Sequence, residues 1–140
     1  MVITRIIKNI IPALPSDETH TNDGGELQFY GRVRDMENGQ PIVALDYEYY
    51  EGMAEKELQK LGEELLEKFS INELDCIHRI GKIPVGEAAL RVTIWSKHRT
   101  EALDAMAWFI SQLKKEVPIW KNAVLKDGSR ITSKCTVCDV

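Results

Sequence analysis

Two stretches of the chain carry apolar residues at the three-to-four-residue spacing of an amphipathic helix. The longer runs from Ser96 to Lys121, with apolar positions at Ala102, Leu103, Met106, Ile110 and Leu113. Pro118 cannot continue a helix and favours an extended residue before it, so we expect this helix to end there. The second runs from Gly52 to Phe69 and has an apolar stripe of Leu58, Leu61, Leu65 and Phe69. The pattern therefore predicts two main helices.

Shorter segments with the alternation of β-strands flank these helices. They are Val2 to Ile11, Glu26 to Arg34, Ile42 to Tyr50, Glu73 to Ile80, Glu87 to Trp95, Asn122 to Lys126 and Arg130 to Val137. Turn residues at Asn38-Gly39 and Asp127-Gly128 predict hairpins between the strands on either side. Short connections favour antiparallel pairing, so we expect an α+β fold with two helices packed against a mostly antiparallel sheet. No linker divides the chain, and residues 1–140 are expected to form a single domain.

Composition and charge narrow the class of protein. The chain has 140 residues, of which 44% are hydrophobic and 29% charged, as in ordinary globular proteins. A net charge of −4 argues against a non-specific nucleic-acid binder and makes local basic clusters more informative. No apolar run approaches the ~20 residues that span a bilayer, and Arg5 and Lys8 interrupt the apolar N-terminus, so no signal peptide is expected. Three cysteines do not make a secreted disulfide framework, and the cytoplasm is the expected compartment.

Two basic clusters are candidates for binding an anion. Arg32 and Arg34 lie two residues apart in an expected strand, so their side chains are expected to point the same way and converge on an anion. A solvated strand face is the commoner explanation of such a pair. Lys97, His98 and Arg99 stand where the long helix begins, and its free N–H groups and dipole favour an anion there. Local capping or packing by His98 is the alternative.

Two lysines near the end of the same helix are candidates for catalysis. Lys114 lies in its last turn, and Lys121 follows Pro118. A lysine withdrawn from water, or close to other cations, loses its proton more readily and can act as an acid, a base or a nucleophile. Lys115 points about 100° away around the helix and serves as a control. The alternative is that these cations only stabilise the helix dipole.

The remaining candidates are weaker. Cys135 and Cys138 form a CxxC pair, but no second ligand pair completes a zinc site and no thioredoxin-like unit surrounds them. Cys76 and His78 share a strand face and make a poor metal pair. Phosphate-binding loops and catalytic-serine motifs are missing. The residues alone thus predict an anion pocket lined by arginine and lysine, with no metal, and they identify no reaction.

Five short motifs resemble those of the large, catalytic subunit of molybdopterin synthase, the MoaE-type family. They are GRVRD (Gly31 to Asp35), LDYEYYEGMAEK (Leu45 to Lys56), HRIGKIPVGE (His78 to Glu87), SKHRTEA (Ser96 to Ala102) and LKKEVPIWK (Leu113 to Lys121). Their order and spacing together make the resemblance specific. It covers about residues 25 to 131, leaves the tail at residues 132–140 unassigned, and implies an α/β-hammerhead fold.

The resemblance implies a sulfur-transfer reaction in molybdenum cofactor biosynthesis. Members of the family convert cyclic pyranopterin monophosphate into molybdopterin by inserting the two sulfurs of its dithiolene. The sulfur arrives as the C-terminal thiocarboxylate of a small ubiquitin-like subunit, so no cofactor is expected on this chain. The implied assembly is a heterotetramer, a homodimer of large subunits with one small subunit at each end. Neither nucleic acid nor membrane is expected as a partner.

Site roles follow only at positions that match the motifs. Lys121 matches the lysine thought to be most directly catalytic, as an acid–base group or transient acyl acceptor, and Lys114 matches the second essential lysine. Arg34, with Arg32 beside it, matches the substrate-binding arginine. His98 and Arg99 match the pair expected to contact phosphate and pterin. Trp120 falls at an aromatic position that helps to shape the pocket.

The chain departs from the family pattern after Lys121. Many members continue with Arg-Glu or Lys-Glu, whereas Asn122 and Ala123 follow here, so we expect only backbone contacts to substrate from these two residues. The family's Arg-Trp is replaced by Arg130-Ile131. The alternative to an enzyme is a non-catalytic module that binds a ubiquitin-like partner or a phosphorylated metabolite, although the two lysines argue against it. A redox or metal role for Cys135 and Cys138 is a third, weaker possibility.

Overall fold

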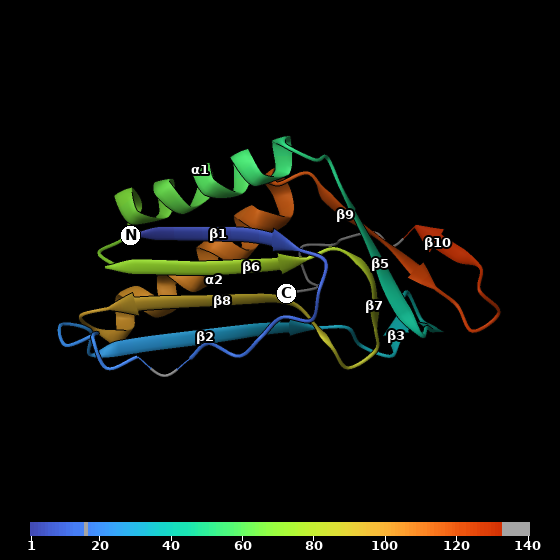
Figure 1. Ribbon diagram of the computed structural model, residues 1–140, viewed down its shortest axis with the longest axis horizontal. Helices are drawn as coiled ribbons and strands as arrows, with labels where there is room; N and C mark the ends of the chain where they lie inside the picture. The colour runs from blue at the N-terminus through green and yellow to red at the C-terminus, as the bar shows by residue number, and fades with distance from the viewer. Residues whose placement is uncertain (16, 133–140) are drawn as a thin grey trace.

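A computed structural model, which describes residues 1–15 and 17–132, contains two four-stranded sheets and two helices (Figure 1). The first sheet has the order β1 (Val2–Ile7), β6 (Glu73–Arg79), β8 (Ala88–Ser96), β2 (Gly25–Arg32). The second has the order β10 (Arg130–Thr132), β9 (Ile119–Val124), β5 (Ala44–Tyr49), β7 (Gly81–Pro84). The strands β3 (Met36–Glu37) and β4 (Gln40–Pro41) form a separate two-stranded ladder. Only the β1–β6 pair is parallel among these described strands.

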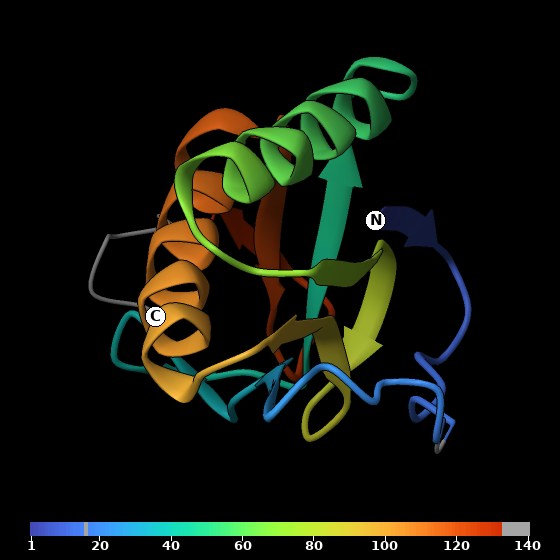
Figure 2. The same cartoon turned by 90° about the vertical axis from the view of Figure 1, so that its left-hand side faces the viewer.

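Both helices lie on one face of the first sheet, and the second sheet stands at its end (Figures 1 and 2). They are α1 (Met53–Lys68) and α2 (Arg99–Glu116), and each turns its apolar stripe to the sheet. The buried residues that fill this core include Leu58, Leu65, Val92, Ile94, Phe109 and Ile110. A smaller apolar cluster of Val33, Ile42, Leu45, Ile83, Ala89 and Ala123 lies beside the second sheet. The two clusters fix how the end of α2 meets the second sheet.

A glycine allows α1 to pack closely on the first sheet. A Cβ atom at Gly62 would lie 2.5 Å from a methyl carbon of Val2 and 3.0 Å from a methyl carbon of Leu74. Real Cβ contacts are longer than the first of these distances, so any larger residue would push the helix or the β1 edge away. Gly62 therefore sets the distance between α1 and the sheet.

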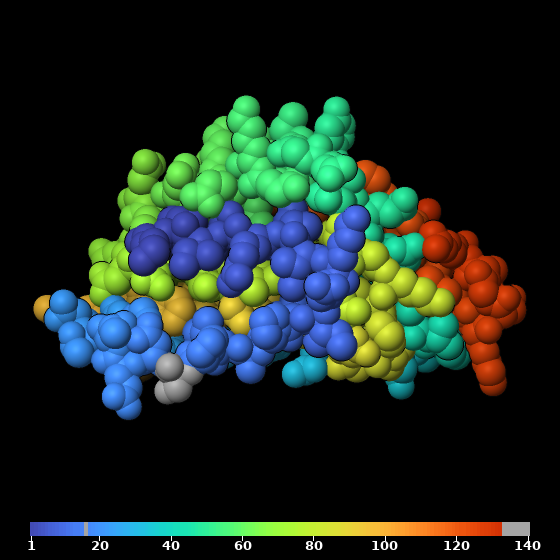
Figure 3. Space-filling view, viewed as in Figure 1, coloured from blue at the N-terminus to red at the C-terminus, as the bar shows by residue number. Residues whose placement is uncertain are grey.

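The segment between β1 and β2 crosses the other side of the first sheet (Figures 1 and 3). Beneath it lies Arg91, whose side chain donates hydrogen bonds to the backbone carbonyl of Pro12 and to Asp75. Both Arg91 and Asp75 are buried, so each charge has the paired partner that burial requires. The hydrogen bond from Arg91 to the carbonyl of Pro12 ties the crossing segment to the sheet.

The α+β class, the mostly antiparallel pairing and the two packed helices are confirmed. The predicted hairpin between residues 26–34 and 42–50 is wrong, because β2 pairs with β8 while β5 pairs with β9 and β7 in the other sheet. The Asn38-Gly39 turn instead joins β3 to β4. The sequence pattern missed β7, which is four residues long and ends in proline. The predicted end of the last strand, Cys135 and Cys138 lie outside the described residues.

In residues 1–15 and 17–132, neither helix combines the length and the apolar character needed to cross a membrane.

Candidate active site

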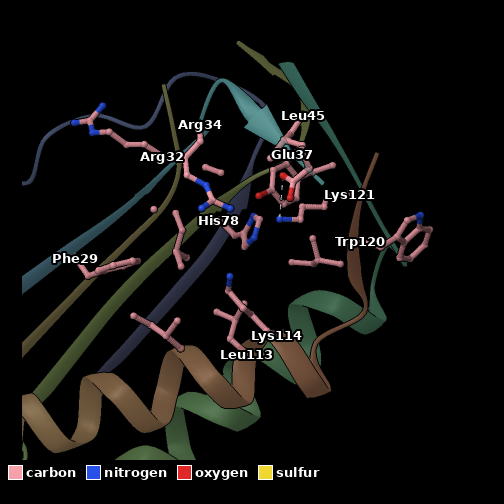
Figure 4. A pocket seen from close by; sticks show the side chains of 16 residues that line it. Phe29, Arg32, Arg34, Glu37, Leu45, His78, Leu113, Lys114, Trp120 and Lys121 are labelled. Carbon is pink, nitrogen blue, oxygen red and sulfur yellow. Dashed lines mark ion pairs between the residues drawn. The ribbon is translucent and has the colours of Figure 1, made fainter. Parts of the chain in front are cut away.

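A cavity of about 120 Å³ opens where the end of α2 meets both sheets (Figure 4). Its walls come from β2 and the loop after it, β3, β5, β6, β8, the last turns of α2 and the start of β9. The polar or charged side chains that line it are Arg32, Arg34, Glu37, Tyr47, His78, Lys114 and Lys121, with Trp120 at the start of β9. The remaining lining residues are apolar or glycine.

The two predicted catalytic lysines lie in this same cavity. Lys114 lies in the last turn of α2, which ends at Glu116, and the chain turns through Val117 and Pro118 into β9. Strand β9 pairs with β5 so that Lys121 faces Tyr47, and its side chain is only 11% exposed. The control residue Lys115 is exposed to solvent. The helix-breaking proline therefore brings Lys121 back beside the helix end that carries Lys114.

Arg32 and Arg34 both border the cavity, but the predicted convergence of their side chains is wrong. The register of β2 shifts between Gly31 and Arg32, and the strand ends at Arg32, so the alternation does not reach Arg34. The Arg32 guanidinium donates a hydrogen bond to the carbonyl of Gly86 at 3.0 Å and lies over the Tyr30 ring. Figure 4 shows it turned away, while Arg34 points into the cavity. Arg34 is therefore the arginine placed to meet a ligand.

His98 and Arg99 lie outside this cavity. His98 is the N-terminal cap residue of α2 and Arg99 its first residue, and both side chains are exposed. Lys114 lies fifteen positions after Arg99 in the helix, which corresponds to about 22 Å along the axis. Within one chain, the two ends of α2 therefore do not contribute to one pocket.

Asn122 and Ala123 do not present side chains to the cavity either. Asn122 lies on the opposite face of β9 from Lys121, and its amide donates a hydrogen bond to Glu48 at 2.8 Å. Ala123 is fully buried in the smaller apolar cluster. Trp120 borders the cavity, yet the residue is 47% exposed and its indole turns away from the interior (Figure 4).

Two residues of the site were missed by the sequence analysis. Glu37 is a buried carboxylate whose Oε2 lies 3.6 Å from Nζ of Lys121. It stands beside the Asn38-Gly39 signal, which predicted only a turn. His78 was considered only as half of a metal pair with Cys76, but it lines the cavity (Figure 4). No local pattern marks either residue, because each becomes significant only through what the fold places opposite it.

His78 is held as a neutral imidazole in one tautomer. Its Nδ1 lies 2.8 Å from the backbone carbonyl of Arg79, and a carbonyl only accepts, so Nδ1 carries the proton. Burial lowers the pKa of His78 to about 4; the hydrogen bond to Arg79 opposes this shift, and the charge of Lys114 adds to it. The unprotonated Nε2 is therefore an acceptor at neutral pH. In Figure 4 the amine of Lys114 points toward this ring.

The neutral state of His78 makes stability depend on pH. Its folded-state pKa of about 4 is below the ordinary value of 6.5, so the unfolded chain takes up the proton first. The free energy of unfolding should therefore fall by about 3 kcal/mol as the pH drops from about 6.5 to about 4. Urea titrations of wild type and His78→Gln across this range check the prediction. The variant should lose this part of the slope, and His98→Gln, at an exposed histidine, is the matched control. Equal slopes for wild type and His78→Gln would contradict it.

Cys76, the other half of the weak metal pair, is buried in the main core. Burial raises the pKa of its thiol, so the protonated form is favoured. Among the described residues, no group of three or more His, Cys, Asp or Glu side chains is placed to hold a metal ion.

The sequence of this chain is similar to those of known proteins. A family model described as "MoaE protein" matches residues 8–116. The chain belongs to the MoaE family. A relative from Pyrococcus abyssi, named molybdopterin synthase catalytic subunit, is 41% identical over 108 residues, which is 77% of this chain and 73% of the relative.

Solved MoaE structures share the fold. The crystal structure of molybdopterin synthase from Staphylococcus aureus superposes with a TM-score of 0.78 at 32% identity, covering 89% of this chain and 93% of that one. A Helicobacter pylori structure, described as a complex of subunits 1 and 2 of molybdopterin-converting factor, matches with a TM-score of 0.72 at 23% identity, covering 94% and 90%. The latter likeness is one of fold alone. The MoaE match contains Arg34, His98, Arg99 and Lys114, and Lys121 follows five residues after its end.

Proposed function

We propose that this chain is the catalytic subunit of molybdopterin synthase. It transfers sulfur from the C-terminal thiocarboxylate of a small ubiquitin-like subunit to cyclic pyranopterin monophosphate and so builds the dithiolene of molybdopterin. The observation that carries the proposal is the meeting of Lys114, Lys121 and Arg34 in one cavity of a MoaE-family chain. We place this reaction in the cytoplasm.

The cavity has the groups that such a reaction needs from the protein. Arg34 and Lys114 supply positive charge for the phosphate of the substrate. Lys121 is the group placed to exchange a proton or take up the acyl group when the bond between sulfur and the terminal acyl carbon breaks. No cysteine is among the described residues that line the cavity, which fits a sulfur atom brought by the partner. We propose that the chain itself holds no cofactor.

The partners follow from the same proposal. The relatives are named as catalytic subunits, and the Helicobacter structure of this fold is a complex of two subunits, so a second, smaller subunit is expected here. The tail of that subunit enters the cavity beside Lys121. His98 and Arg99 keep their proposed role as substrate contacts, but α2 holds them too far from Lys114 to act in the same site of one chain. In the proposed homodimer, they reach the cavity of the neighbouring protomer.

Mixed dimers test this sharing of residues. Lys121→Ala and Arg99→Ala should each be inactive as homodimers. In a mixed dimer, one cavity has both changes and the other has neither, so that one cavity should work. Random exchange of equal amounts makes half of the dimers mixed, which predicts about a quarter of wild-type product formation.

The mixed dimers would give a different result if the residues were not shared between protomers. If both residues serve the cavity of their own chain, every site in the mixture keeps one defect and activity stays at the level of the homodimers. The matched control mixes Lys121→Ala with Lys114→Ala, two residues that line the same cavity, and should recover no activity.

The enzyme proposal is tested by conversion in vitro. The purified chain is mixed with cyclic pyranopterin monophosphate and a thiocarboxylated small subunit, and molybdopterin is followed as its fluorescent oxidised derivative. Product is expected only when all three components are present. A tight complex with the small subunit but no product would support the alternative, a non-catalytic module that binds a ubiquitin-like partner.

A further inference from the structure

Glu37 is a carboxylate in a cavity that otherwise gathers positive charge. Among the described lining residues, Arg32, Arg34, Lys114 and Lys121 carry positive charge, and Glu37 is the one acid. A carboxylate repels an anionic substrate, and burying it costs free energy unless it is paired. Its place in this cavity therefore has to be explained by what it contacts.

The contact is with the lysine proposed to be most directly catalytic. Oε2 of Glu37 lies 3.6 Å from Nζ of Lys121, and the two side chains are 5% and 11% exposed (Figure 4, dashed line). Water screens a pair that is this far buried much less than it screens a surface ion pair. The carboxylate therefore lies close enough to the amine to hold it in place.

The β3–β4 ladder fixes Glu37 in this place. Asn38 and Gly39 have φ values of 51° and 77°, the left-handed conformation that a tight two-residue turn requires. The N–H of Ile42 donates to the carbonyl of Asp35 at 3.0 Å and closes the base of the hairpin. Met36 is exposed and Glu37 buried, so the alternation of β3 points the carboxylate inward. The hairpin thus places the carboxylate of Glu37 next to the amine of Lys121.

We propose that Glu37 is a positioning residue for Lys121, which it holds in the cavity in the protonated form until substrate and the tail of the small subunit enter. This inference rests on the proposed function of Lys121. The other titratable or charged groups around the cavity are Arg32 and Arg34 at and after the end of β2, Tyr47 on β5, His78 on β6 and Lys114 on α2. None of these is negatively charged at neutral pH. Glu37 is therefore the group whose neutralisation removes the stabilising anion.

Glu37→Gln tests the proposal because it removes the charge and keeps the size of the side chain. The readout is the pH at which Lys121 becomes half-reactive toward acetic anhydride, measured by competitive labelling and mass spectrometry of the whole folded chain. An ammonium that loses a neighbouring carboxylate gives up its proton more easily, so the midpoint should move to lower pH by about one unit. Glu37→Asp draws the carboxylate back and should shift it the same way by less.

The matched control is Asp35→Asn. Asp35 is an exposed carboxylate two residues before Glu37, so this variant loses the same charge without touching the pair. Its midpoint should equal that of wild type. An unchanged midpoint in both folded Glu37 variants, or an equal shift in Asp35→Asn, would overturn the proposal.

Labelling of Lys121 needs no turnover, so this test is independent of the conversion assay that tests the proposed function. In the conversion assay, the limb of the rate–pH profile that depends on Lys121 should move to lower pH in Glu37→Gln, in the same direction as the labelling midpoint. A merely structural role for Glu37 would lower the amount of folded protein and leave the position of that limb unchanged. If wild type makes no product, the proposed function fails while the labelling result still decides the role of Glu37.

Discussion

Replacing Lys121 with alanine is expected to lower the rate of molybdopterin formation by about 1,000-fold, the usual range for the loss of a positioned acid–base group. Lys121 lines the same cavity as Lys114, and its side chain is only 11% exposed to solvent. The measurement is single-turnover conversion of cyclic pyranopterin monophosphate with excess thiocarboxylated partner, which separates the chemical step from partner exchange. Binding of the small subunit should persist.

Lys121→Ala also leaves the Glu37 carboxylate buried without its partner, which by itself destabilises the fold. The double variant Lys121→Ala/Glu37→Gln removes this problem and is the proper control. It should regain thermal stability relative to Lys121→Ala and remain inactive. Product formation by a folded Lys121→Ala chain at more than about a tenth of the wild-type rate would show that Lys121 is not the reacting group.

Replacing Lys114 with alanine is expected to lower kcat/KM for cyclic pyranopterin monophosphate by about 100-fold. The cavity loses one of the two charge-assisted contacts proposed for the phosphate, and Arg34 then supplies the other without it. Steady-state kinetics with saturating partner measure the effect, which should fall more heavily on KM than on kcat.

Lys115 provides the matched control for this variant. It is the same residue type in the same helical turn, but it is exposed and does not line the cavity. Lys115→Ala should therefore keep kcat/KM within about twofold of wild type, with the same small loss of helix-dipole stabilisation. Similar losses for both variants would assign the effect to the helix end and not to the cavity.

Local patterns were sufficient to predict the two helices and where Lys114 and Lys121 lie relative to the end of α2. The three-to-four-residue spacing and Pro118 predicted a helix that ends before Lys121, and α2 ends at Glu116. Periodicity and a helix-breaking residue are properties of neighbouring residues, so the sequence contains them in full. The reaction was predicted only from the resemblance of the five motifs to those of the family. The prediction that the side chains of Arg32 and Arg34 converge was wrong, because the register shift after Gly31 depends on pairing with β8, a strand more than fifty residues away.

The sequence by itself determined that the chain is an α+β member of the MoaE family, with Lys114 before and Lys121 after a helix-breaking proline. Only the tertiary structure decided which charges meet. It placed Glu37 against Lys121, turned Arg32 outward, set His78 in the cavity wall and kept His98 and Arg99 at the far end of α2. The reason is physical: helix and turn signals act over a few residues, whereas burial and charge pairing join residues that the chain holds far apart.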